Sequence, residues 1–306
     1  MACFGDCTMI VKAFTFEKYN NRKNVGSTRI RIRNLMKYWP ELTEYKYGER
    51  ADVMIFQKVY VTGESGRSSQ YDYIKHVPWI KILDICDPDW LGDAAITKGC
   101  LIRQTVDAVD AVVTSTEELA KFIRQFTDKP VVVIKDRFLV DDAPAPKQHV
   151  GPARKAIWFG YSHNAELLRG AMRAIERRGM SLTVLSDKDP MAWRWAQDQD
   201  AYKELYTFKT YAEDTFYETM RKHDVCILPA GGRPQDRFKS NNKTVKAWLA
   251  GLPVVTNDEE LEAMMEAPAR NREALARWTE AKKEYDARKS VEEYKALINS
   301  ILGNNT

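Results

Sequence analysis

The chain has 306 residues, and its 47 Lys and Arg against 43 Asp and Glu give a formal net charge of +4. This length predicts two domains, each large enough to bury its own hydrophobic core. The apolar share of 44% and the charged share of 29% are typical of globular proteins, and no stretch approaches the roughly 18 apolar residues of a membrane span, which argues against membrane-spanning, fibrous and disordered proteins.

The first half of the chain alternates between predicted strands and helices. Apolar strands are predicted at residues 8–14, 52–57, 80–86, 108–115 and 130–135. Apolar residues at helical spacing predict a helix at 29–38, ended by Pro40, and Thr116 is a candidate N-cap for a helix at 117–126. Continuous β-branched runs separated by helices predict a parallel sheet that is buried on both faces.

A linker is predicted near the middle of the chain, and a second α/β unit follows it. Residues 141–153 contain three prolines and a glycine, a composition typical of a connection between domains. After them we predict strands at 155–159, 181–186, 205–211, 224–229 and 253–256, with helices at 165–178, 215–223 and 240–250. From Glu259 the tail reads as a charged helix with a break near Pro268.

Five cysteines, an odd number spread over a long chain, argue against a disulfide scaffold. They are Cys3, Cys7, Cys86, Cys100 and Cys226. Only Cys3 and Cys7 lie close together, and no second pair completes a zinc set, so we expect no metal site. Residues 1–7 lack the basic segment of a secretory signal, and we expect a cytoplasmic protein with reduced thiols, in which Cys86 and Cys226 pack as small apolar residues in strands.

Ligands of open α/β sheets bind at the carboxyl ends of strands, and four such ends carry informative residues. In the first, Gly26, Ser27 and Thr28 open a helix with a row of arginines. Free amides at a helix start attract phosphate, although an ordinary N-cap on a basic surface helix explains the same residues. In the second, Asp84 and Asp87 end a strand, where a carboxylate serves as a general base or simply starts a turn.

The other two strand ends belong to the second half of the chain. Gly160 follows a strand and allows close approach of a ligand, and His163 would then sit at the positive end of a helix, as a site residue or as a merely structural histidine. The strongest signal is the Gly231-Gly232 loop followed by residues 239–243, Lys-Ser-Asn-Asn-Lys, at a helix start. Residues 231–250 hold five basic residues and one acid, so basic side chains and helix amides together predict a diphosphate site.

Several nucleotide-binding and hydrolytic motifs are missing from the sequence. It contains no Walker pattern, no G-x-G-x-x-G fingerprint, no H-E-x-x-H and no G-x-S-x-G. P-loop ATPases, ordinary dehydrogenases, zincins and α/β-hydrolases are therefore disfavoured.

The fourth segment resembles the C-terminal signature of GT-B glycosyltransferases, in the large retaining, glycogen-synthase-like group that uses nucleotide-sugar donors. Its residues are DVCILPAGG at 224–232 and KSNNKTVKAWLAGLPVVTN at 239–257. Further similar stretches are VGSTRIRIRNL at 25–35, IKILDICDPDW at 80–90, VDAVVTSTEELAKFI at 109–123, PVVVIKDRFLVDD at 130–142, KAIWFGYSHN at 155–164 and SVEEYKALINSIL at 290–302. Taken together, the similar stretches cover almost the whole chain.

The resemblance implies a GT-B fold, with two Rossmann-like domains facing across a cleft. It implies an acceptor-side domain at 1–145, a nucleotide-sugar-binding domain at 146–270 and a helical segment at 271–306 near the domain junction. It also implies that the protein transfers a hexosyl or pentosyl group from a nucleotide-diphosphate sugar, with no cofactor beyond the donor, to the hydroxyl of a glycan or small molecule.

The resemblance assigns a role to each matching stretch. Diphosphate would be held by Gly26, Ser27, Thr28, Gly160, Lys239, Ser240, Asn241, Asn242 and Lys243. The nucleotide base and sugar would contact Lys209, Thr210, Tyr211, Gly231, Gly232 and Asp236. Catalytic roles fall to Asp87, Asp84 and His163, with Asp84 and Asp87 facing the acceptor.

One departure from the family pattern affects the donor site. Many retaining members carry two glutamates spaced E-x7-E, and here Phe238 and Lys246 occupy the matching positions. The usual carboxylate contact to the donor is therefore missing or comes from another residue, such as Asp236. Donor identity and the stereochemical outcome stay open.

Three alternatives stand beside this function. In the first, the acceptor is a hydroxymethylated pyrimidine in DNA, as in phage enzymes of this fold; the arginines Arg29, Arg31 and Arg33 would contact phosphates, and the aromatic residues Tyr71, Tyr73, Trp79 and Trp90 a flipped base. In the second, the chain is a non-catalytic relative that only binds nucleotide sugar. A nucleotide-sugar epimerase of the same architecture is the third.

Overall fold

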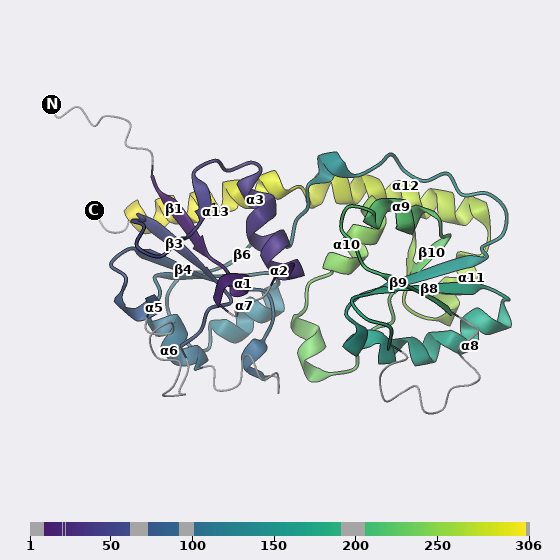
Figure 1. The fold of residues 1–306 in the computed structure, drawn as a ribbon, viewed down its shortest axis with the longest axis horizontal. Helices are drawn as coiled ribbons and strands as arrows, with labels where there is room; N and C mark the ends of the chain where they lie inside the picture. Colours follow the sequence, from purple (N-terminus) through teal and green to yellow (C-terminus); the bar gives the residue numbers. More distant parts are fainter. Residues whose placement is uncertain are drawn as a thin grey trace. The chain divides into compact units, whose positions relative to one another are not determined.

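The computed structural model describes residues 9–19, 21, 23–61, 73–91, 101–190 and 206–303, and these residues fall into two compact units (Figure 1). Unit 1 takes the chain up to Phe138, the segment Arg233–Ser240 and the chain from Asp286 onward. Unit 2 consists of Leu139–Gly232 and Asn241–Tyr285. Each unit has a parallel sheet of its own with helices packed against it, which confirms the predicted α/β class.

Unit 1 is built on a six-stranded parallel sheet in the order β2-β1-β3-β4-β5-β6. Its strands are β1 (Val11–Phe14), β2 (Leu42–Glu44), β3 (Val53–Gln57), β4 (Ile80–Ile85), β5 (Ala111–Thr114) and β6 (Val131–Val133). All five predicted strands are present within a few residues of their expected bounds. The unpredicted β2 has only three residues, of which Leu42 alone is buried, and so leaves almost no apolar pattern in the sequence.

Helices cover both faces of this sheet (Figure 1). Short helices are α1 (Phe16–Tyr19), α5 (Tyr73–His76) and α6 (Ile102–Asp107); α7 spans Glu117–Ile123 and α13 spans Ala287–Gly303. On one face Leu119 and Ile123 of α7 join Phe56, Leu83 and Val112 in a buried cluster. Thr116 caps α7 as predicted, because its hydroxyl accepts a hydrogen bond from the Leu119 amide at 3.2 Å.

The first predicted helix exists but contains a π-helical turn. The chain runs through α2 (Gly26–Thr28), the π turn η1 (Arg29–Arg33) and α3 (Asn34–Met36) without a break. A π turn inserts one extra residue per turn, so three consecutive residues, Ile30, Arg31 and Ile32, are all buried. The alternation of charged and apolar residues in this segment does not predict a π turn.

Unit 2 has a five-stranded parallel sheet in the order β11-β10-β7-β8-β9. The strands are β7 (Lys155–Phe159), β8 (Ser181–Ser186), β9 (Tyr206–Thr210), β10 (Val225–Ile227) and β11 (Val254–Val255). Alternate residues of β7 point to opposite faces. Ala156 and Trp158 join a cluster with α8, whereas Ile157 and Phe159 join a cluster with α9 and α10.

The helices of unit 2 lie where the sequence predicts them. They are η4 (Ser162–Leu168) running into α8 (Arg169–Arg177), α9 (Phe216–Arg221), α10 (Asn242–Leu249), α11 (Asp258–Ala263) and α12 (Ala267–Glu284). The turn η7 (Pro234–Phe238) lies in a segment with no predicted helix and belongs to unit 1. Pro268 starts α12 because a proline in the first turn lacks only an amide that has no helical partner. None of the helices that the structure describes is long and apolar enough to cross a membrane.

Two cysteines can be compared with the prediction. Cys86 and Cys226 are buried free thiols, Cys226 inside β10 and Cys86 directly after β4, as expected for small apolar residues. Burial raises the pKa of both thiols. Cys3, Cys7 and Cys100 lie outside the described residues.

The predicted linker packs against unit 2 through a buried histidine. The His149 amide donates to Asn271 Oδ1 at 2.7 Å, and Asn271 returns a hydrogen bond to the His149 carbonyl at 3.0 Å. The His149 ring is 2% exposed, and its Nε2 lies 3.1 Å from the Gly251 carbonyl. Gly251 has φ +77°, and a Cβ there would lie 2.5 Å from the Lys147 amide nitrogen, so glycine is required at this contact.

We predict that His149 makes the fold sensitive to acid. Burial and the nearby Lys147 charge lower the pKa of His149 to about 4, against an ordinary value near 6.5. Between these values the unfolded chain binds a proton that the folded chain does not, so stability falls with decreasing pH, by at most roughly 3 kcal/mol. In thermal melts from pH 7 to pH 4, His149→Gln should lose less stability than the wild type. His76→Gln, at an exposed site, should follow the wild type, and identical slopes for all three proteins would contradict the prediction.

Candidate functional site

At the carboxyl edge of the unit 1 sheet, one lysine joins two carboxylates. Lys58 follows β3, and its Nζ lies 2.9 Å from Asp87 Oδ2 and 3.1 Å from Asp89 Oδ1. The Asp89 carboxylate also accepts a hydrogen bond from the Tyr60 hydroxyl at 2.9 Å. Of the three charged side chains, Asp87 is the most exposed, at 38%. Asp87 therefore presents this cluster to solvent, as a candidate catalytic carboxylate must.

The two carboxylates of this cluster differ in acidity. Burial opposes ionisation of both groups. At Asp87 the attraction of Lys58 outweighs burial and lowers the pKa, whereas at Asp89 burial and the repulsion of Asp87 outweigh Lys58 and raise the pKa. Asp87 is therefore ionised at neutral pH. Sequence reasoning found Asp87 but missed Lys58 and Asp89, since neither follows a recognisable motif.

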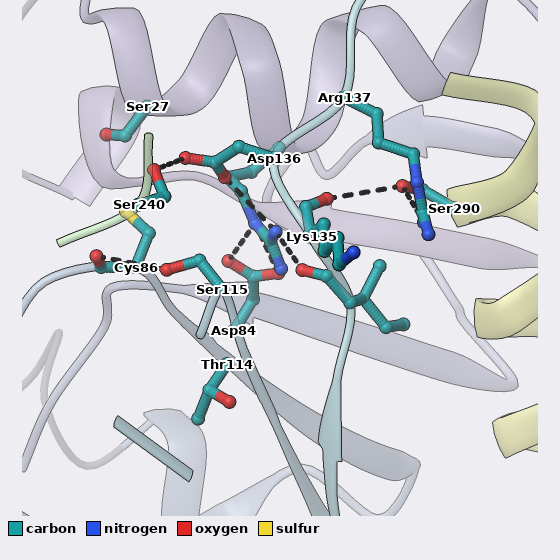
Figure 2. A network of polar contacts seen from close by, with 12 residues as sticks. Ser27, Asp84, Cys86, Thr114, Ser115, Lys135, Asp136, Arg137, Ser240 and Ser290 are labelled. Carbon is teal, nitrogen blue, oxygen red and sulfur yellow. Dashed lines mark hydrogen bonds and ion pairs between the residues drawn. The ribbon is translucent and has the colours of Figure 1, made fainter. Parts of the chain in front are cut away.

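Asp84 has a structural role instead of the predicted acceptor-facing one. It is fully buried, and its carboxylate accepts hydrogen bonds from Arg31 Nη2 at 2.7 Å and from the Tyr294 hydroxyl. Arg31 also donates to the Ile134 carbonyl at 2.5 Å and pairs with Asp136 at 3.2 Å (Figure 2). Successive residues of a strand alternate between faces, and Asp84 points to the face where Arg31 and Tyr294 of α13 enclose its carboxylate, out of reach of an acceptor.

Gly26, Ser27 and Thr28 lie at the carboxyl end of β1, held by a buried glutamine. Gln57 accepts a hydrogen bond from the Thr28 hydroxyl at 3.0 Å and from the Phe16 amide at 2.9 Å. Thr28 is fully buried, whereas Gly26 and Ser27 are half-buried. Only Gly26 and Ser27 of this predicted triplet are thus accessible to a ligand.

The predicted diphosphate segment is divided between the two units. Lys239 and Ser240 belong to unit 1, and Asn241, Asn242 and Lys243 to unit 2. Lys239 pairs with Asp236 at 2.7 Å. Burial opposes ionisation of Asp236, but hydrogen bonds from Lys239 and Arg233 prevail and lower its pKa. The Ser240 hydroxyl donates to Asp136, as Figure 2 shows.

Lys243 and Gly160 come together in unit 2. Lys243 lies in the first turn of α10, and its Nζ lies 5.7 Å from the centre of the Trp158 ring. A Cβ added to Gly160 would lie 3.1 Å from Lys243 Nζ and 3.1 Å from the Trp158 ring, so both side chains pack closely against this glycine and a larger residue would crowd them. The structure therefore places a cation beside a small residue at the start of a helix. Asn241 precedes α10, and its side chain donates to the Tyr285 hydroxyl at 2.8 Å instead of capping the helix.

The predicted nucleotide-base residues lie at the end of β9, next to an unpredicted ion pair. Lys209 and Thr210 are exposed. The Tyr211 hydroxyl accepts a hydrogen bond from the buried Lys246 at 2.6 Å, and Lys246 also contacts both carboxylate oxygens of Glu213, at 2.6 and 2.8 Å. The Glu213 side chain is 46% exposed. Glu213 thus pairs with Lys246, the residue that occupies the position of the second glutamate of the family pattern.

His163 lies on the surface of unit 2. Its ring stacks on that of Tyr161, with centroids 5.8 Å apart, and both residues are exposed. The neighbouring Ser162 amide donates to Asp187 Oδ1 at 2.7 Å. His163 follows Gly160 closely in the chain, and its Nε2 lies 3.2 Å from the side-chain nitrogen of Asn164. Gly231 and Gly232 are likewise exposed.

The described residues contain no group of three or more His, Cys, Asp or Glu side chains placed to hold a metal ion.

The fold is shared with solved glycosyltransferases. HepE of Anabaena, solved in complex with UDP, is 9% identical with a TM-score of 0.63, and the match covers 95% of this chain and 100% of that one. WaaG, a glycosyltransferase of lipopolysaccharide biosynthesis, is 14% identical (TM-score 0.57, 92% and 99% covered), and AviGT4, of avilamycin A biosynthesis, is 12% identical (TM-score 0.55, 96% and 98% covered). No family model and no curated protein matches the sequence. The chain has the GT-B fold of these enzymes, as the resemblance predicts.

We predict that Asp84→Asn destabilises unit 1 far more than Asp87→Asn does. The first change leaves the buried Arg31 guanidinium without its bidentate partner, which costs about 3–5 kcal/mol. The second removes a partly exposed ion pair and costs about 1 kcal/mol. Urea unfolding of both variants measures the difference, and equal losses would show that Asp84 is not the structural partner of Arg31.

Proposed function

We propose that the protein is a glycosyltransferase that moves a sugar from a nucleotide-diphosphate donor to an acceptor hydroxyl. The observation that carries the proposal is the position of Lys243, in the first turn of α10 and packed against Gly160, which follows β7. The GT-B fold supports it, and so does HepE, a protein of this fold that binds UDP.

In this proposal unit 2 binds the donor. The diphosphate is the leaving group, and its developing charge is stabilised by Lys243 and by the amides at the start of α10, with Asn242 beside them. Gly160 lets the phosphates approach the backbone. The nucleotide base and ribose contact Lys209, Thr210 and Tyr211, while Gly231 and Gly232 leave space in front of β10. We give Lys239 and Ser240 a smaller role than the resemblance implies, because Asp236 and Asp136 engage their side chains.

Unit 1 supplies the acceptor side of the reaction. Asp87 is an ionised, partly exposed carboxylate at the carboxyl edge of the sheet, and it takes the proton of the acceptor hydroxyl. The proton leaves the hydroxyl as its oxygen bonds to the anomeric carbon and the bond to the diphosphate breaks. Exclusion of water from the bound donor suppresses its hydrolysis.

We do not extend the acceptor to DNA. Arg31, in the middle of the arginine row behind that alternative, is 3% exposed and paired with Asp84. Arg33 pairs with Glu17 and Glu44. Tyr73, Trp79 and Trp90 pack against the hydrophobic core of unit 1, and Tyr71 lies outside the described residues. Two of the three arginines behind the DNA alternative are therefore engaged by carboxylates of unit 1 and less available to a phosphate backbone.

A donor screen tests the proposed function, and Lys243→Ala tests its site. We expect one of UDP, GDP, ADP, CMP or dTDP to raise the melting temperature by mass action. Lys243→Ala should weaken that nucleotide by about 1.5–3 kcal/mol, the scale of a charge-assisted hydrogen bond, measured by titration calorimetry. Lys222→Ala, an exposed lysine of the same unit, should bind as the wild type does. Unchanged affinity in Lys243→Ala would remove Lys243 from the site.

Asp87→Asn should slow sugar transfer by about 10²–10⁴-fold, because the amide cannot accept the proton of the acceptor. Donor affinity should stay within about twofold of the wild type, since Asp87 holds no part of the donor in this proposal. Release of nucleotide diphosphate in the presence of acceptor measures the rate. Asp107→Asn, exposed in the same unit, is the control, and transfer at the wild-type rate in Asp87→Asn would refute its role as the base.

A further inference from the structure

Lys58 has an unusual backbone and an unusual environment. Its φ is +54°, in the left-handed region that side chains other than glycine seldom adopt, and its amide donates to the Asp84 carbonyl at 2.9 Å. The side chain is 8% exposed. Its Nζ lies 4.9 Å from the centre of the Phe16 ring, in addition to contacting Asp87 and Asp89. Strained residues of this kind persist where the surrounding contacts hold them, and they cluster at functional sites.

The cluster is expensive to bury and lies where α/β proteins bind ligands. Lys58 and Asp89 are largely withdrawn from water, at 8% and 15% exposure, and buried charges of this kind generally stabilise a fold less than apolar residues of similar volume would. The chain nevertheless places them at the carboxyl ends of β3 and β4, which is the ligand-binding edge of a parallel sheet. A functional demand on the cluster explains its position better than a demand for stability does.

One oxygen of Asp87 remains available for a ligand. Asp87 Oδ2 accepts from Lys58 Nζ at 2.9 Å and from the Cys86 thiol at 3.4 Å. Within the described ranges, no donor lies at hydrogen-bonding distance from Oδ1. Asp89 meanwhile holds the opposite side of the ammonium and is itself held by Tyr60. The cluster therefore fixes one edge of the Asp87 carboxylate and leaves the other edge without a protein donor.

We infer that Lys58 is the positioning residue for the acceptor base: it holds the Asp87 carboxylate through Oδ2, so that Oδ1 receives the proton of a neutral hydroxyl acceptor. The inference rests on the proposed function. As the acceptor oxygen bonds to the anomeric carbon, the electron pair of the breaking bond leaves with the diphosphate, and the hydroxyl proton neutralises Asp87. Asp89 keeps Lys58 in place and does not touch the substrate.

The pH dependence of transfer follows from the groups around Asp87. Those groups are Lys58, Cys86, Asp89 and Lys239, of which Lys58 is in direct contact and lowers the pKa of Asp87 most strongly. Without Lys58, Asp87 loses its cation and also faces the uncompensated charge of Asp89. Both effects favour the protonated form, so the pKa of Asp87 rises and activity is lost at a higher pH.

Lys58→Met is the central variant, and the acid limb of the pH profile of kcat/KM is the readout. We expect the limb to move to higher pH by about one unit or more, which lowers kcat/KM about tenfold per unit in the acid range. Lys58→Arg keeps the charge and should keep the limb near its wild-type position. Lys12→Met removes another ion-paired lysine of unit 1, half-buried beside Glu49, and should leave the limb unchanged.

A second variant keeps the test decisive if Lys58→Met fails to fold. Lys58→Met combined with Asp89→Asn removes one positive and one negative charge, which relieves the repulsion around Asp87. The acid limb of this double variant should lie at a pH between those of the wild type and Lys58→Met. If only the double variant folds, its acid limb should lie at a higher pH than that of the wild type. An acid limb at the wild-type pH in every folded Lys58→Met protein would overturn the inference.

Donor titration separates this outcome from failure of the proposed function. Lys58→Met should bind the nucleotide diphosphate found in the screen within about twofold of the wild type, because only the acceptor side is changed. If the wild type binds no such nucleotide and transfers no sugar, the proposed function has failed and the inference falls with it. If the wild type binds and transfers while the limb does not move, only the role of Lys58 is wrong.

Discussion

The buried guanidinium of Arg31 holds together parts of unit 1 that are far apart in the sequence. It comes from the π turn after α2, and it reaches Asp84 in β4, the Ile134 carbonyl and Asp136 after β6. Asp84 in turn accepts from Tyr294 of α13, and Asp136 accepts from Ser240. Since a buried cation is tolerated only with such partners, the first helix, the sheet and the C-terminal helix must assemble together.

The two aspartates near the end of β4 show how strand geometry divides structural from chemical roles. Asp84 lies within the strand, points to the face on which Tyr294 of α13 lies, and forms an ion pair with Arg31. Asp87 follows the strand, lies at the edge of the sheet and meets Lys58 while remaining partly exposed. Of these two aspartates, three positions apart, Asp84 thus stabilises the fold and Asp87 remains accessible to a substrate.

Buried strands could be predicted from the sequence because their apolar residues are continuous, as in β7 and β8, whose bounds match the prediction. Contacts between distant residues could not be predicted. No residue pattern around Arg31 predicts a π turn. No pattern around Lys58 predicts that it pairs with two carboxylates about thirty positions away in the sequence. The sequence also did not predict that Phe238 belongs to unit 1. In the structure its ring is 3% exposed and lies 5.4 Å from that of Phe122. The candidate site was therefore predicted where it follows strand ends, as at Gly160 and Asp87, and missed where it depends on tertiary pairing.

The lysine at position 246 departs from the glutamate of the family pattern, and its surroundings compensate for the departure. An unpaired buried cation beside a donor site would distort the local field, but Lys246 lies against both oxygens of Glu213 and the Tyr211 hydroxyl. The ammonium also lies 4.1 Å from the centre of the Phe216 ring. Burial of the Lys246 ammonium requires these partners in any case, so the pair explains how a lysine is accommodated at this position and leaves the half-exposed Glu213 carboxylate accessible to a ligand.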